Sequence, residues 1–218
     1  MKHSLLSAVL LTGALASAQS AIVITEVHPT GNNASYAADW FELTNNGASA
    51  VNITGWKIDD SSASFASALA LRGVTNIASG ASVIFLEGIA DGTTDSTIAT
   101  NFRSAWFGAN PPAGLMIGGY GGSGAGLGNS GDAVNIYDST GTLVANVSFL
   151  AATTGTTFDN PSGANGAVTT KSVSGVNGAF TSPGGEIGSP GAVPEPGSAT
   201  LLFGAIAGIA ALRRRRSA

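Results

Sequence analysis

Side chains suited to acid–base or nucleophilic chemistry are scarce in this sequence. Histidine occurs twice, at His3 and His28, and there is no cysteine. The missing thiol excludes cysteine nucleophiles and thiolate zinc sites. A Ser–His–Asp triad would need His28 as its general base, because His3 lies in a segment expected to be removed. No Gly-x-Ser-x-Gly elbow precedes a helix. We therefore expect no catalytic residue, and His28 to be a polar residue at a strand end.

A glycine pattern at Gly119–Gly124 matches the spacing of a dinucleotide-binding loop. That chemistry requires a strand before the glycines and a helix after them. Here the following residues are again glycine, alanine and leucine, so we expect a flexible loop.

Several carboxylates lie near expected strand ends or in loops, where they could bind calcium. Calcium needs six to eight converging oxygens, and no Asp-x-Asp-x-Asp loop supplies them. We expect solvated acids, no metal site and no cofactor; a carboxylate pair of the glycosidase kind stays open, because nothing distinguishes one pair. The candidates are Asp39, Glu42, Asp59, Asp60, Asp91, Asp95 and Asp132.

Two tryptophans, Trp40 and Trp56, could stack on sugar rings. Tryptophans in a β-sandwich are more often core or rim residues, so a core or rim position is the prediction. Three Asn-x-Ser/Thr matches, at Asn33, Asn52 and Asn146, are interpreted as chance in a chain rich in these residues.

The charge distribution argues against a nucleic-acid partner. Residues 19–190 hold four basic and twelve acidic residues, a formal net charge of −8. The whole-chain value of −4 hides this, because the remaining basic residues lie at the two ends. An acidic body repels phosphate backbones.

The N-terminal residues 1–18 have the pattern of a secretory signal peptide. Lys2 is followed by an apolar run from Leu5 to Leu15, and Ala16 and Ala18 form an A-x-A cleavage site. Cleavage there would leave Gln19 as the first mature residue. Residues 19–196 would then lie outside the cytoplasm.

The C-terminal residues 192–218 combine three compositions. Pro194, Glu195 and Pro196 form a stiff, extended motif. Residues 199–212 carry no charge and would span about 21 Å as a helix, against a hydrocarbon core of about 30 Å. The chain then has a basic block that would stay in the cytoplasm. We expect a short transmembrane helix with a cytoplasmic stop formed by Arg213, Arg214, Arg215 and Arg216.

This order of motif, apolar run and arginines resembles the PEP-CTERM sorting signal of Gram-negative bacteria. The resemblance implies recognition and cleavage by an exosortase-type enzyme. It implies a transient anchor in the inner membrane, followed by transfer to the cell surface or extracellular matrix.

The body, residues 19–191, reads as short strands separated by turn residues, which predicts an all-β sandwich. One helix is expected over 101–107, capped by Thr100 or Asn101 and ended by Gly108. A hairpin is expected at Ser139-Thr140-Gly141. The predicted strands are 22–28, 39–45, 51–53, 55–59, 82–87, 133–138 and 143–149, with a weaker one at 66–71.

Parts of this body resemble a lamin tail domain. The resemblance spans roughly residues 20–191. It rests on residues 24–27, on Trp40-Phe41-Glu42-Leu43-Thr44-Asn45 followed by Gly55-Trp56, on Phe102 with Trp106-Phe107-Gly108, on residues 131–138 and on the closing Gly188-Ser189-Pro190-Gly191. It implies an immunoglobulin-like β-sandwich without enzymatic activity. The chain departs from the family in a glycine-rich insertion, 118–131, and a low-complexity run, 151–185.

Together these observations predict an exported, non-catalytic surface or matrix protein with an adhesive or binding β-sandwich. Its expected partners are the processing enzyme and extracellular polysaccharide or surface proteins. Two alternatives stay open: a calcium-dependent carbohydrate-binding module and a secreted hydrolase.

Overall fold

The structure, a computed structural model, describes residues 21–29, 36 and 39–192. The signal-peptide residues Ala16 and Ala18, the sorting motif at 194–196, the apolar run and the arginine block lie outside these residues. Among the described residues, no helix is long and apolar enough to cross a membrane.

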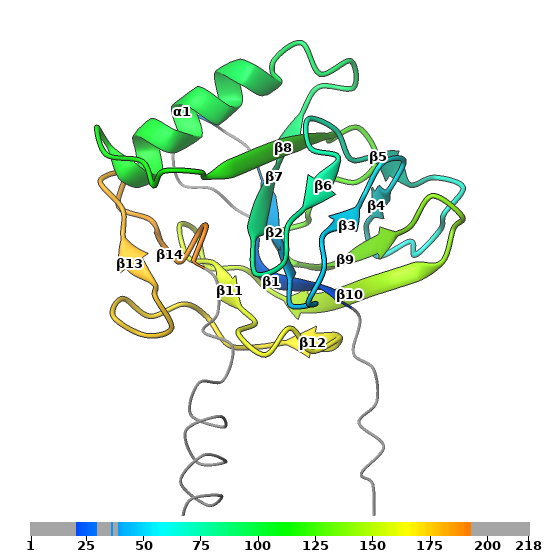
Figure 1. Ribbon diagram of the computed structural model, residues 1–218. Coiled ribbons are helices and arrows are strands. Elements are labelled where there is room, and N and C mark those ends of the chain that lie inside the picture. Colours follow the sequence, from blue (N-terminus) through cyan, green and yellow to red (C-terminus); the bar gives the residue numbers. More distant parts are fainter. Residues whose placement is uncertain (1–20, 30–35, 37–38, 193–218) are drawn as a thin grey trace, which may run out of the picture.

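The first sheet has five strands in the order β11-β1-β2-β7-β8 (Figure 1). Its strands β1, β2 and β7 are antiparallel neighbours, whereas β8 runs parallel to β7. This sheet carries the candidate functional site. The bounds are β1 Ile22–His28, β2 Trp40–Asn45, β7 Ser82–Gly88, β8 Met116–Gly121 and β11 Phe158–Asp159.

The second sheet also has five strands, in the order β12-β10-β9-β4-β5. Two further pairs, β3 with β6 and β13 with β14, form small two-stranded sheets. The strands of the large sheet are β4 Lys57–Asp59, β5 Leu69–Ala70, β9 Gly131–Tyr137, β10 Leu143–Leu150 and β12 Gly166–Val168. The small ones are β3 Val51–Asn52, β6 Asn76–Ile77, β13 Phe180–Thr181 and β14 Ile187–Gly188.

The main hydrophobic core lies between the two large sheets. Alternate residues of each strand point into it, as the period-2 pattern requires: in β10, Ala145, Val147 and Phe149 are buried while Ser148 and Leu150 are exposed. Residues from both sheets meet in this core, among them Ile24, Phe41, Leu43, Val83, Phe85, Ile58, Val134, Ile136 and Phe158. The predicted mostly β architecture with one short helix is therefore confirmed, in the form of a two-sheet sandwich.

The helix α1, Asp95–Phe107, covers the outer face of the first sheet near β7 and β8. Its buried residues Phe102, Ala105 and Trp106 pack with Trp40 of β2 in a second cluster. The predicted start at residue 101 is wrong, because the helix begins six residues earlier, after Thr94. Asp95 near that end fits the helix dipole and binds Arg72. The predicted end is right: Gly108 has a positive φ of 60°.

Most strand predictions hold, and the strand at 66–71 shrinks to β5. The hairpin after β9 turns at Gly141, with a φ of +91°. The flexible loop expected at Gly119–Gly124 is wrong in its first half, because Gly119 to Gly121 belong to β8. Glycine is needed there for close approach: a Cβ on Gly118 would lie 2.6 Å from Phe85 and 2.7 Å from the Arg72 carbonyl oxygen.

Candidate functional site: the anchored closing segment

A pair of glutamates lies on the outer face of the first sheet. Glu26 of β1 is the register partner of Glu42 of β2, and both are buried, with 1% exposure each. A register shift between Ile24 and Glu26 marks a β-bulge. Because Ile24 and Val27 both enter the main core, the two residues between them, Thr25 and Glu26, both face outward. The bulge thus adds a hydroxyl to the carboxylate face.

Hydroxyl groups link the neighbouring strands on this face. Thr25 donates from Oγ1 to Oε1 of Glu42 at 2.6 Å and lies 2.9 Å from Thr44 Oγ1, which in turn lies 2.6 Å from Ser82 Oγ. The expectation that Glu42 is a solvated acid is therefore wrong. The alternation that turns Phe41 and Leu43 inward does turn Glu42 outward, but the outer face is itself covered.

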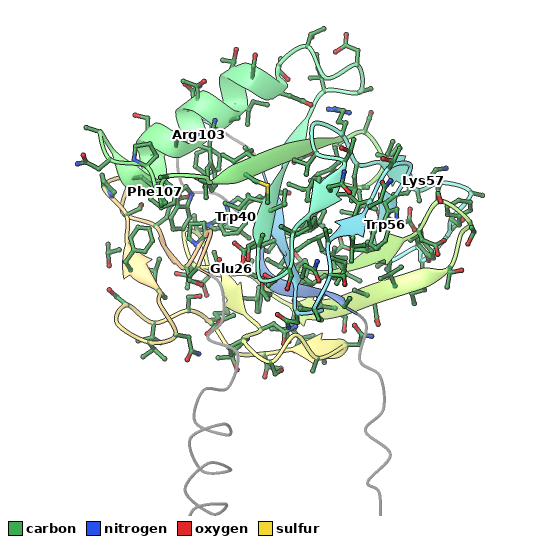
Figure 2. The ribbon with its side chains drawn as sticks, viewed as in Figure 1. Glu26, Trp40, Trp56, Lys57, Arg103 and Phe107 are labelled. Carbon is green, nitrogen blue, oxygen red and sulfur yellow. The ribbon has the colours of Figure 1, made fainter. Side chains whose placement is uncertain are left out.

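The cover is the closing segment, which we define as residues 186–191. The backbone N–H of Ser189 donates to Oε1 of Glu26 at 2.7 Å, and that of Gly191 donates to Oε2 of Glu42 at 2.5 Å. The hydroxyl of Thr157 also donates to Oε1 of Glu26, at 2.5 Å. Figure 2 shows Glu26 in the interior, between the sheet and the late strands of the chain. The two carboxyl groups thus anchor the closing segment to the first sheet.

Close packing fits the closing segment to this face. A Cβ on Gly188 would lie 2.7 Å from Oε1 of Glu26, 2.8 Å from Thr157 and 2.9 Å from the Trp106 ring. A glycine at this position lets the backbone approach the carboxylate. Ala192 then closes a turn by donating its N–H to the Ser189 carbonyl oxygen.

Burial makes ionisation of the glutamate pair unfavourable. The pKa of Glu26 is raised, first by desolvation and then by the charge of Glu42, while the hydrogen bonds from Thr157 and Ser189 act in the opposite direction. The pKa of Glu42 is also raised by desolvation, against hydrogen bonds from Thr25 and Gly191. The folded site therefore favours protonated carboxyl groups.

A second cluster of buried polar side chains lies beside the glutamate pair. Tyr36 donates its hydroxyl to the Glu186 carboxylate at 2.8 Å, and Trp106 donates from Nε1 to the Tyr36 oxygen at 3.3 Å. His28 Nε2 lies 3.6 Å from Glu186 Oε1. Burial lowers the pKa of His28 to about 4, so this pair is not an ion pair at neutral pH. These contacts hold the first residue of the closing segment.

His28 is the last residue of β1, as predicted, and its side chain is buried in the core. Its exposure is 0%, and its ring packs at 5.4 Å from Trp40 and 6.0 Å from Trp106. A substrate cannot reach the imidazole in this arrangement.

The two candidate sugar-stacking tryptophans are also buried. Trp40 has 0% exposure and Trp56 has 7%, which confirms the predicted core or rim positions. Trp56 shares the main core with Ile58. Figure 2 shows both tryptophans inside the fold. Neither presents a face to a sugar.

The remaining carboxylates are dispersed. Asp59 is buried and accepts from Ser62, Ser64 and Ser67, so its expected solvation is wrong. Asp91 caps its own turn at Thr93. Asp132 accepts backbone N–H groups of Ser61, Gly128 and Ala133. Among the described residues, no group of three or more histidine and carboxylate side chains is placed to hold a metal ion.

The sequence did not predict that Asp39, Glu87 and Tyr120 lie close together. The pKa of Asp39 is raised to about 8 by burial and by the nearby charge of Glu87. The hydroxyl of Tyr120, at 0% exposure, finds no hydrogen-bond partner among the described residues. Burial raises the pKa of Tyr120, and the charges of Glu87 and Asp39 raise it further. These groups lie under the glycine-rich segment that follows β8, where the Leu127 N–H donates to Asp39 at 3.2 Å.

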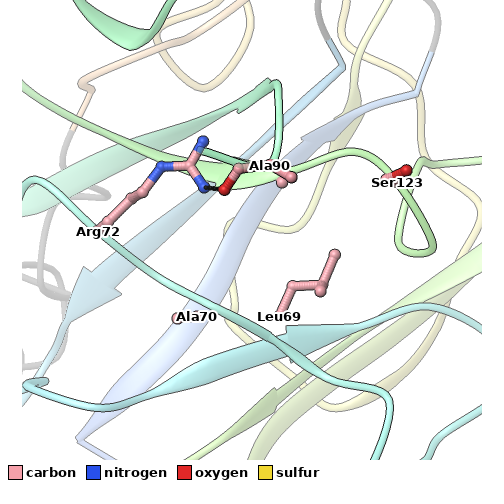
Figure 3. Close-up of a pocket in the computed structure, with 6 residues that line it drawn as sticks. Leu69, Ala70, Arg72, Ala90 and Ser123 are labelled. Atoms are coloured by element: carbon pink, nitrogen blue, oxygen red, sulfur yellow. Dashed lines mark hydrogen bonds between the residues drawn. The ribbon is translucent and has the colours of Figure 1, made fainter. Parts of the chain in front are cut away.

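A pocket of about 110 Å³ opens near the same segment (Figure 3). Its one charged lining residue, Arg72, is already bound: Nε lies 2.6 Å from Asp95 Oδ2, and Nη2 lies 2.9 Å from Oδ1. The lining therefore lacks the facing carboxylates that a glycosidase would need. It consists of Leu69, Ala70, Arg72, Ala90, Gly121 and Ser123.

Comparison with known families gives two matches. Residues 16–151 match the family described as Lamin Tail Domain, and residues 192–216 match the PEP-CTERM protein-sorting motif. No curated protein and no solved structure matches the chain. The first match includes both glutamates of the pair but ends before β11 and the closing segment. The second begins at the residue that follows Gly191.

Proposed function

Because this chain belongs to the lamin tail domain family and carries a PEP-CTERM sorting motif, we propose that it is an exported, non-catalytic surface or matrix protein. Its β-sandwich would serve as an adhesion or binding module. An exosortase-type enzyme would process the tail while the apolar run anchors the chain in the inner membrane of a Gram-negative bacterium.

The observation that carries this proposal is the position of the closing segment. Ser189 and Gly191 are fixed to the buried carboxyl groups of Glu26 and Glu42, and Pro194 follows Gly191 by three residues. These contacts support a domain that ends just before the sorting motif. A processing enzyme could cut at the motif without unfolding the sandwich. This is the arrangement expected of a folded exported domain whose sorting signal is removed by cleavage.

The polar side chains of the site support a structural role. Glu26, Glu42, His28 and Glu186 are buried and engaged with the protein's own backbone and aromatic residues. Their contacts join the closing segment to the first sheet. This supports a non-catalytic domain.

Sorting is tested by comparing intact cells with and without the exosortase. We expect the mature chain to start at Gln19, to end near the motif only when the enzyme is present, and to reach the surface. A matched pair of variants, Glu195→Gln and Glu186→Gln, separates motif recognition from domain folding, because Glu195 belongs to the motif whereas Glu186 accepts a hydrogen bond from Tyr36 inside the domain. A terminus that stays at Ala218 in both strains would refute processing.

Binding is tested with the secreted polymer of the producing cells. The purified chain should be retained by that polymer and not by an unrelated polysaccharide. Equal retention on both would argue against a specific adhesion module.

A calcium-dependent carbohydrate binder is the second candidate, favoured by the raised pKa of Asp39 beside Glu87. A divalent cation would relieve the repulsion between these two groups. Calcium should then raise the melting temperature, and Asp39→Asn should abolish that rise. A melting temperature unchanged by calcium would eliminate this candidate.

A further inference from the structure

Two exposed apolar side chains lie in one short loop that precedes β13. Val173 is 59% exposed and Val176 is 49% exposed. The loop, residues 173–179, is held by its own backbone: Val176 N–H donates to the Val173 carbonyl oxygen at 2.9 Å, and Ala179 N–H donates to the Val176 carbonyl oxygen at 2.8 Å. We call this loop the exit loop. Its two valines are presented on a fixed turn.

The exit loop lies at the point where the described chain ends. A Cβ placed on Gly178 would be 3.2 Å from Cβ of Ala192. Asn177 ties the other side of the loop to the first sheet by donating from Nδ2 to Asp159 of β11 at 2.8 Å. The exit loop therefore approaches Ala192 at Gly178, two residues beyond Val176.

The length of the tail limits how far this loop can move from the membrane. Six residues, 193–198, separate Ala192 from the apolar run that begins at Ala199. Six extended residues span at most about 22 Å. If the apolar run enters the bilayer, the exit loop is kept within about that distance of the outer leaflet.

The distribution of charge also favours the exit loop as the part of the domain that contacts the membrane. Residues 172–185 carry no charged side chain, in a body of formal charge −8. The acidic residues that flank this stretch in the sequence, Asp159 and Glu186, are buried. A bilayer surface with anionic lipids repels an acidic protein but admits an uncharged, apolar loop.

We propose that the exit loop rests in the interface of the outer leaflet of the inner membrane, with Val173 and Val176 as its contacts, while the precursor is anchored by its tail. This proposal rests on the proposed function, because it requires the apolar run to enter the bilayer. Two valines bind a membrane weakly by themselves. The tether raises their effective concentration at the surface, so contact is expected only in the anchored chain.

The absence of cysteine in the sequence permits a direct test. Single variants Val173→Cys, Val176→Cys, Ile89→Cys and Ala205→Cys are labelled with a polarity-sensitive fluorophore in the full chain. The chains are reconstituted in vesicles of phosphatidylethanolamine and phosphatidylglycerol, with and without nitroxide-labelled lipid. Ile89 is the matched control, because it is apolar and 50% exposed and belongs to the segment between β7 and α1. Figure 1 shows this segment on the other side of the fold from β13.

We expect the labels at residues 173 and 176 to be quenched at least twofold more than the label at 89. Adding Val176→Asp should return the label at 173 to the level of residue 89, whereas Ile89→Asp should leave it unchanged. Equal quenching at 89, 173 and 176, with strong quenching at 205, would overturn the membrane contact of the loop while leaving the anchor intact. No quenching at 205 would instead refute the anchor, and with it the sorting arrangement from which the loop proposal starts.

Discussion

The backbone N–H of Ser189 lies 2.7 Å from Oε1 of Glu26, a residue 163 positions earlier in the chain. This contact joins the end of the domain to its first strand. It places a buried carboxyl group, rather than an apolar side chain, at the closing point of the fold. A carboxyl group can accept several backbone N–H groups that would otherwise be buried without a partner. Its drawback is the cost of ionisation.

That cost predicts a pH dependence of stability. The pKa values of Glu26 and Glu42 are raised by burial, so above about pH 4.5 the folded protein keeps protons that the unfolded chain releases. Stability from this pair is fully present below that pH and is lost as the pH rises through neutrality. Urea unfolding at pH 7, 8 and 9 should give a midpoint that decreases steadily. Below about pH 6.5 the lowered pKa of His28 acts in the opposite direction, because the unfolded chain takes up a proton there that the folded imidazole does not.

The control is Glu26→Gln, which keeps an acceptor oxygen for Ser189 but cannot ionise. This variant should show a flatter decline between pH 7 and 9. A residual slope is expected from Glu42, which stays buried, and from Asp39, whose pKa is raised to about 8. If the wild-type midpoint rises with pH over this range, the assignment of the pair as buried and protonated is wrong.

Gly188 offers a steric test of the closing segment. In Gly188→Ala the new Cβ collides with Glu26, Thr157 and Trp106, which should cost about 1–3 kcal/mol of folding free energy. The local consequence is sharper: the amides of Ser189 and Gly191 should lose their hydrogen-exchange protection.

The matched control for that change is Gly185→Ala. Gly185 has a φ of +84°, so alanine is strained there, but a Cβ would meet nothing within 4 Å. This variant should lose stability through the backbone alone and keep the protection of the Ser189 amide. Equal loss of protection in both variants would show that the contact with Glu26 does not hold the segment.

The parts of the fold that follow local patterns could be predicted from the sequence. Alternation places Phe41 inward and Glu42 outward, and β1 has the predicted bounds of residues 22–28. Alternation cannot show that the outer face is covered by a segment about 150 residues away. The burial of Glu42 was missed for that reason. The only local signal was a Thr-Glu pair within an apolar strand, since two adjacent polar residues there indicate a bulge.

The errors at α1 and β8 have the same origin. Residues 95–100 of the helix are mostly polar, so only the apolar end that contacts Trp40 was recognisable. In β8, the glycines from Gly119 onward led to the prediction of a flexible loop, yet at the neighbouring Gly118 glycine is what lets this strand approach Phe85. Both cases depend on tertiary neighbours that a single sequence does not display.

Substitution of Asp95 tests how α1 is attached to the sandwich. Its two oxygens accept from Nε and Nη2 of Arg72, and both side chains are about a quarter exposed. Asp95→Asn should lower stability by about 1 kcal/mol after solvent screening is considered. The difference should shrink in 0.5 M salt. Asp91→Asn, a fully exposed neighbour, should leave the unfolding midpoint almost unchanged; a larger effect at 91 than at 95 would contradict the role of the ion pair.

Two buried tyrosines provide a final, internally controlled prediction. Tyr36→Phe removes a hydroxyl that donates to Glu186 and leaves a buried carboxylate with one donor fewer, which should cost about 1–3 kcal/mol. Tyr120→Phe removes a hydroxyl that has no partner among the described residues, so stability should stay level or rise by up to about 1 kcal/mol. Urea unfolding of both variants at pH 7 measures the difference. A loss at Tyr120 as large as that at Tyr36 would mean that Tyr120 has a bound partner, such as a water or cation held with Asp39 and Glu87.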